Sequence, residues 1–103
     1  MNARAGPDYP TDLPPGLTFR RKTPVFTEAS VPDALTKDHT TKAGVWGVIH
    51  VKRGRLRYCV PSEGSAVEIA AGGAAIVAPE VPHRVTPLGE VAFYVAFWGA
   101  SDS

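Results

Sequence analysis

From position 17 onward, apolar and polar residues are distributed as in a chain of short β-strands. Segments rich in β-branched and aromatic residues alternate with clusters of Gly, Pro, Ser and Asp at intervals of about ten residues. No apolar stripe with the 3.6-residue period of a helix extends beyond about two turns. The pattern predicts an all-β sandwich or barrel with strands over residues 17–21, 25–27, 34–40, 45–51, 55–60, 66–70, 74–77, 83–86 and 91–98.

Two glycine-containing segments predict how these strands connect. Gly54 stands where a short hairpin loop requires a positive φ, so strands 45–51 and 55–60 are expected to pair directly. The Ala-Gly-Gly sequence at 71–73 predicts a second tight turn, immediately before strand 74–77.

The final strand, 91–98, carries apolar side chains at both odd and even positions, which predicts burial on both faces. A lone domain of this size has little structure with which to cover both faces. We therefore expect a homodimer that covers the surplus apolar surface. The alternative is that residues 1–16 fold back over the strand.

Length and composition allow one domain. The chain has 103 residues, and residues 1–16 contain four prolines, which oppose both a helix and a central strand. We interpret 1–16 as a Pro-rich N-terminal arm and 17–103 as the β-barrel domain.

Charge and cysteine content exclude several classes of function. Eleven Lys and Arg against ten Asp and Glu give a formal charge of +1, so the chain has no extended field for nucleic acid or anionic lipid. The basic cluster at 20–22 is interpreted as a solvated strand end. No segment approaches the roughly 20 apolar residues of a membrane span or the apolar core of a signal peptide. The single cysteine, Cys59, fits a reducing compartment, so a cytoplasmic protein is expected.

Three histidines are the candidate metal ligands. His83 follows the Pro-rich turn 79–82, which presents it rigidly, and His39 lies at another junction between a turn and a strand. His50 alternates with Trp46 within a strand, a pattern that also fits a hydrogen-bonded wall residue. Three imidazoles would suit zinc, nickel, copper or ferrous iron, and zinc is the ion we expect first. Two imidazoles would need a carboxylate or waters as well.

Other side chains are candidates for a second tier of the site. Glu80 and Asp38 are the acidic residues closest in sequence to the histidines, although exposed turn carboxylates are common. Lys42 could hold an anion, and Trp46 could wall a cavity, with a solvated loop and core packing as the alternatives. No serine-histidine-aspartate order, paired catalytic glutamates or phosphate-binding loop is present.

The segment from Gly73 to His83 resembles the second cupin motif, whereas Gly47 stands where many cupins carry a metal-binding glutamate. A more specific resemblance covers about residues 20–98. It is to the small cupin-like domain found at the N-terminus of some TehB tellurite-resistance proteins and as free-standing YeaR-like proteins. Its motifs here are Thr23-Pro24-Val25-Phe26, residues 39–49, residues 51–58 and Pro79-Glu80-Val81-Pro82-His83-Arg84-Val85.

This resemblance implies a small cupin-like barrel, a double-stranded β-helix, with His39 and His83 at the family's histidine positions. In the long TehB proteins a methyltransferase domain follows, and this chain has no glycine-rich loop for S-adenosylmethionine, so that activity is not implied. Two functions are left open. One is a module that binds a metal and a small anion in a response to toxic compounds. The other is a metal-dependent enzyme that acts on a small oxygen-bearing substrate.

Overall fold

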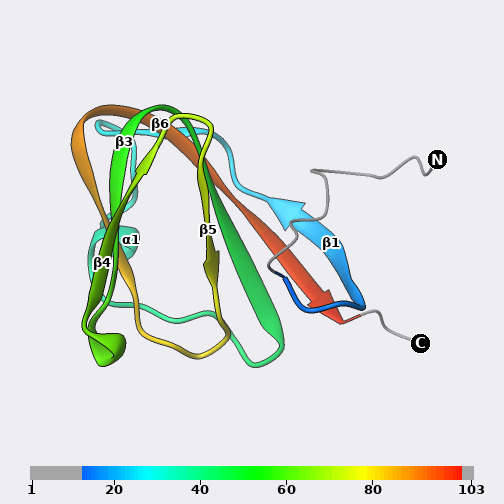
Figure 1. Ribbon diagram of the computed structural model, residues 1–103. Coiled ribbons are helices and arrows are strands. Elements are labelled where there is room, and N and C mark those ends of the chain that lie inside the picture. The colour runs from blue at the N-terminus through cyan, green and yellow to red at the C-terminus, as the bar shows by residue number, and fades with distance from the viewer. Residues whose placement is uncertain (1–12, 101–103) are drawn as a thin grey trace.

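A single bent antiparallel sheet makes up most of the computed structural model, which describes residues 13–100 (Figure 1). The strand order is β1-β6-β3-β4, with β2 also paired to β6 and β5 also paired to β3. All of these pairings are antiparallel, and the prediction of an all-β fold is confirmed. The elements are β1 (Leu17–Lys22), β2 (Phe26–Thr27), α1 (Asp33–Thr36), β3 (Val45–Val60), the 3₁₀ turn η1 (Pro61–Glu63), β4 (Ser65–Ala70), β5 (Ala74–Val77) and β6 (Arg84–Ala100).

The two long strands, β3 and β6, pair with each other along nearly their whole length. Their register runs from Val45 opposite Gly99 to Cys59 opposite Arg84, with irregularities between Val51 and Leu56. Because β-bulges bend a strand, the sheet bends sharply at this point and forms two walls. One wall contains β5 and the first half of β3, and the other contains β4 and the second half of β3 (Figure 1).

The predicted hairpin at Gly54 is wrong, although its backbone conformation is correct. Gly54 has a φ of +76°, but strands 45–51 and 55–60 are continuous as β3, and both halves pair with β6. The glycine makes a bulge here, where the backbone carbonyl of Glu90 lies so close that a Cβ would collide with it. The predicted strands 83–86 and 91–98 are likewise one strand, β6.

The predicted strand 34–40 is also wrong. The segment begins with α1, which follows Pro32 and carries Asp33 in its first turn. Proline and an acidic residue both favour a helix N-terminus, and this signal prevails over the β-like composition. The amide of Leu35 donates to the carbonyl of Pro32 at 3.0 Å, and the Leu35 side chain packs against the core. No helix within residues 13–100 has the length and apolar character needed to cross a bilayer.

The remaining short strands lie close to their predicted positions, as β1, β2, β4 and β5 show. The turn at 71–73 is confirmed, with a φ of +87° at Gly72, whose amide donates to the carbonyl of Val51.

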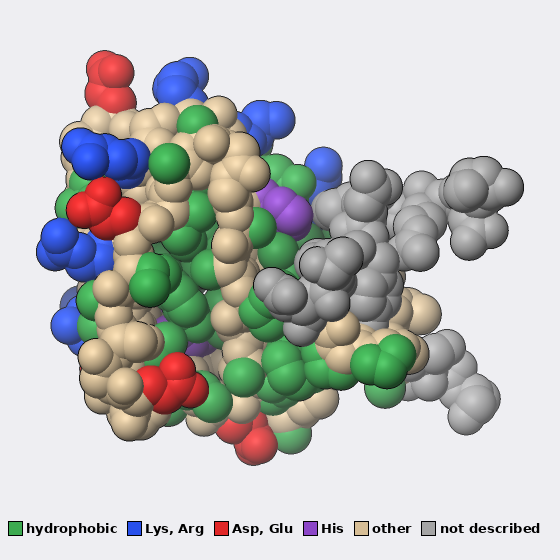
Figure 2. All heavy atoms as spheres, in the orientation of Figure 1, with side chains coloured by type: hydrophobic (Ala, Val, Ile, Leu, Met, Phe, Trp, Pro, Cys, Tyr) green, Lys and Arg blue, Asp and Glu red, His purple; other side chains and the backbone are tan. Residues whose placement is uncertain are grey.

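Apolar side chains pack on both faces of the sheet. The inner cluster lies between the two walls, and Figure 2 shows hydrophobic side chains in the hollow between β4 and β5, with Lys and Arg at the periphery. The outer cluster contains Val48, Ala96 and Trp98, covered in part by Leu13 and Phe19. The final strand is therefore buried on both faces, as predicted. The inner cluster consists of Ile49, Val51, Leu56, Tyr58, Val60, Ile69, Val77, Val85, Val91 and Phe93.

Leu13 belongs to the predicted N-terminal arm, and it is only 5% exposed. Part of the outer face is thus covered by the chain itself, without a second copy. Residues 1–12 of the arm lie outside the described residues, so its division from the barrel at residue 16 stays a prediction, as does the homodimer.

The bulge at Gly54 can be tested by comparing two alanine substitutions. Gly54→Ala should lower the free energy of unfolding by about 3 kcal/mol or more, because an unfavourable φ adds to a backbone collision. Gly89→Ala is the matched control: its φ is +86°, but no atom lies within 4 Å of the added Cβ, so a loss of about 1 kcal/mol is expected. Urea unfolding measures the loss of unfolding free energy in both variants. Equal losses would contradict the close approach of the Glu90 carbonyl to Gly54.

Tyr58 provides a test of the inner cluster at alkaline pH. Burial raises the pKa of Tyr58 to about 12, with the charge of Glu63 as a smaller cause. The unfolded chain loses this proton near pH 10, so the folded state binds more protons between about pH 10 and 12. This contribution to stability is fully present below pH 10 and is lost as the pH rises through 12. Alkaline unfolding should therefore be less steep in Tyr58→Phe than in the wild type, and identical profiles would contradict the burial.

Candidate functional site

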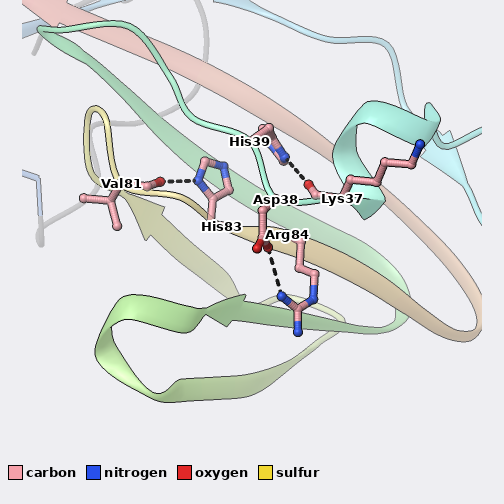
Figure 3. Close-up of polar contacts among 6 residues, drawn as sticks. All are labelled: Lys37, Asp38, His39, Val81, His83 and Arg84. Carbon is pink, nitrogen blue, oxygen red and sulfur yellow. Dashed lines mark hydrogen bonds and ion pairs between the residues drawn. The ribbon is translucent and has the colours of Figure 1, made fainter.

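His39 and His83 lie side by side, although 44 positions separate them in the sequence (Figure 3). His39 lies in the segment between α1 and β3, and His83 immediately precedes β6. The two residues form an isolated antiparallel bridge in which each amide donates to the other's carbonyl at 2.9 Å. Their ring centroids are 4.2 Å apart, with an angle of 58° between the ring planes. The bridge therefore fixes two imidazoles next to each other.

Each imidazole is oriented by a backbone carbonyl two residues earlier. Nδ1 of His39 lies 2.9 Å from the carbonyl oxygen of Lys37, and Nδ1 of His83 lies 2.8 Å from that of Val81 (Figure 3). A carbonyl oxygen can only accept, so both Nδ1 atoms carry the proton and donate. Within residues 13–100 neither Nε2 has a hydrogen-bond partner, so both lone pairs are available to a ligand.

His83 is the more buried of the pair, at 4% exposure. Burial lowers the pKa of His83, and the adjacent His39 contributes in the same direction, while the hydrogen bond to Val81 and the charge of Asp38 oppose the shift. The ring of His83 is therefore neutral at pH 7, which is the form that binds a metal.

Asp38 does not join the histidines. Its Oδ1 lies 2.9 Å from Nη1 of Arg84, across the same bridge but on the opposite side from the rings (Figure 3). Both side chains are about half exposed, so the ion pair contributes little to stability. The carboxylate closest in sequence to His39 is thus engaged elsewhere.

A cavity of about 430 Å³ opens beside the two imidazoles. Its walls are mainly apolar, and its charged groups are all cationic: Arg20 and Arg21 from β1, and Lys42 from the loop before β3. No carboxylate occurs among its described lining residues. These are Arg20, Arg21, Thr23, Leu35, His39, Thr40, Thr41, Lys42, Val45, Gly47, Ile49, Val77, His83, Val85, Phe93, Val95 and Phe97.

The structure places the other candidates away from this cavity. His50 follows Ile49 on β3 and points to the opposite face, where its ring stacks on Tyr94 at 4.8 Å. Trp46 packs on the outer cluster, and Glu80 occupies an exposed turn with a φ of 64°. Within residues 13–100 no three His, Cys, Asp or Glu side chains form a group able to hold a metal.

The sequence does not indicate that two basic residues border the cavity. Arg20 and Arg21 are exposed, as the interpretation of 20–22 as a solvated strand end expects, and they also line the cavity because β1 pairs with the end of β6. The register slips between Phe19 and Arg21, and no local signal in the sequence reveals such a bulge.

Comparisons with known proteins agree on the fold. A structure of a protein from Escherichia coli strain K12, a structural-genomics target, is 22% identical with a TM-score of 0.82, over 88% of this chain and 98% of that one. A cupin-2 domain protein from Shewanella frigidimarina is 16% identical with a TM-score of 0.51, over 93% of this chain and 82% of that one. The chain therefore has a small cupin-like β fold. No curated protein sequence matches it.

TehB from Haemophilus influenzae is 24% identical with a TM-score of 0.75. The match covers 84% of this chain but only 32% of TehB, so the chain corresponds to about a third of that protein. The model of the TehB-like domain family matches residues 21–95, which is most of the sequence. The chain therefore belongs to the TehB-like domain family.

Proposed function

We propose that the chain is a small cupin-like module that binds a divalent metal ion, and with it a small anion, beside His39 and His83. The observation that carries the proposal is the paired arrangement of two Nδ1–H groups tied to carbonyls and two Nε2 atoms left without partners. Histidine ligands commonly donate their second ring nitrogen to a carbonyl in this way, which fixes the tautomer and the ring orientation. Zinc is the ion that neutral imidazoles suit best here, with iron, nickel or copper as alternatives.

The protein ligands fit a metal ion that keeps open coordination positions. Two imidazoles are available, and no carboxylate among the described lining residues supplements them, so water or a bound anion would complete the coordination. A closed structural zinc site, with four protein ligands, does not fit these residues. His50 is not part of the proposed site because its ring lies on the other face of β3.

The charge of the cavity supports an anionic ligand. Arg20, Arg21 and Lys42 are its only described charged side chains apart from the titratable histidines. A pocket with one sign of charge and low-dielectric walls concentrates ions of the opposite sign. The sequence predicts Lys42, Trp46 and Glu80 as substrate-binding residues, and the proposed site includes only Lys42 of these three.

A role in the response to toxic compounds, tellurite among them, is supported by family membership alone. The methyltransferase activity of long TehB proteins is not part of the proposal, and cytoplasmic location stays a prediction. The alternative, a metal-dependent enzyme acting on a small oxygen-bearing substrate, draws support from the open positions that two ligands would leave.

Metal binding can be tested with three histidine variants of the full chain. His39→Ala and His83→Ala should each weaken zinc binding at pH 7.5 by about tenfold or more, because two ligands leave no redundancy. His50→Ala is the matched control and should bind zinc like the wild type. Equilibrium dialysis with elemental analysis gives the affinities, and circular dichroism confirms folding.

Three outcomes would speak against the site. Zinc binding retained in the His39→Ala, His83→Ala double variant would place the metal elsewhere. An equal loss in His50→Ala would indicate that the outer face contributes. A folded wild type that binds none of zinc, ferrous iron, nickel and copper would refute the metal proposal altogether.

A further inference from the structure

The size of the cavity exceeds what a bare inorganic anion would fill. Its volume is about 430 Å³, whereas one water molecule occupies about 30 Å³ in the liquid. Cavities that hold organic ligands begin at about 300 Å³. A hydrated ion beside the histidines would leave most of the space in contact with water.

The apolar walls also favour an organic ligand over a bare inorganic anion. Ile49, Val77 and Phe93 are among the most buried side chains of the inner cluster, and they also line the cavity. Such walls give a hydrated anion no favourable contact, but they stabilise an apolar group by removing its surface from water.

The charged groups mark the polar side of the same cavity. Arg21 comes from β1, and Lys42 lies three residues after His39 in the same loop, whereas the guanidinium of Arg20 donates to the carbonyl of Ala100. The guanidinium of Arg21 lies 4.6 Å from the centre of the Phe97 ring, which holds this charge against the cavity wall. Guanidinium groups bind carboxylates through paired hydrogen bonds.

We infer that the natural ligand is an organic carboxylate with an apolar body. Its carboxylate lies at the cationic and histidine side of the cavity, and its body contacts the apolar walls. This inference rests on the proposed function and names the chemical class of its anion. The ligand binds without any covalent step.

Gly47 lines the cavity at a point where an added side chain would meet the apolar wall. A Cβ at this position would lie 3.3 Å from Cβ of Val77 and 3.6 Å from Cγ1 of Val95, both of which line the cavity. The added methyl group would crowd the apolar wall and leave the cationic side unchanged. We therefore assign to Gly47 a role in specificity for the size of the apolar body.

Three probes test the inference by calorimetry on the full chain, with and without zinc. Phenylacetate should bind about tenfold more tightly than acetate, because its ring adds apolar contact, and 2-phenylethanol, which has no charge, should bind about tenfold more weakly than phenylacetate. Arg21→Gln and Lys42→Gln should each weaken phenylacetate binding. Arg57→Gln, which alters an exposed arginine outside the cavity, should not.

The Gly47→Ala variant separates size from charge. It should lose affinity for phenylacetate by about fivefold or more and retain its affinity for acetate, provided that circular dichroism shows a native fold. Should this variant fail to fold, the comparison of the three probes on the wild type decides the question by itself.

The outcomes distinguish this inference from the proposed function. Zinc binding without preferential binding of phenylacetate over acetate would overturn the inference and leave the metal site standing. Phenylacetate binding by a protein that binds none of zinc, ferrous iron, nickel and copper would support the inference and refute the metal site. Equal binding of phenylacetate and 2-phenylethanol would also overturn the inference, because the cationic groups would then play no part.

Discussion

The antiparallel pairing of β3 with β6 is the interaction on which the other elements depend. β1 and β2 pair with β6, and β4 and β5 pair with β3. Each of these four strands is therefore held by one of the two long strands. The bulges near Gly54 bend both strands together and turn one sheet into two walls. The inner cluster and the cavity both lie in the space that this bend encloses.

The same pairing decides which residues face the cavity. Side chains alternate along a strand, so Ile49 points inward whereas Val48 and His50 point to the outer face. A slip of one residue would exchange the two sets. The cationic residues on β1 depend on this register as well, because β1 pairs with the end of β6 beside Phe97. The composition of the cavity is thus a property of the whole sheet.

Local patterns in the sequence predict most of the strands and the turn at 71–73, but they miss α1 and the continuity of β3 and β6. Alternation and turn residues located β1, β4 and β5 because these depend on neighbouring residues. A glycine with positive φ can make either a hairpin or a bulge, and at Gly54 the bulge accompanies the pairing of β3 with the distant β6, which places the carbonyl of Glu90 against it. Two histidines beside turns are recognisable as candidates, but the position of His50 on the outer face and of Arg21 at the cavity follows from the register of strands far apart in the sequence.

The imidazoles owe their orientation to main-chain atoms, and this has an evolutionary consequence. The carbonyl groups that fix His39 and His83 belong to Lys37 and Val81, but every amino acid, proline included, supplies the same carbonyl. The orientation of the rings therefore does not depend on which side chains stand at positions 37 and 81, although the Val81 side chain also packs against the inner cluster. The geometry of the pair requires the two histidines and the backbone conformation of residues 37–39 and 81–83, so it tolerates divergence in many of the side chains around it.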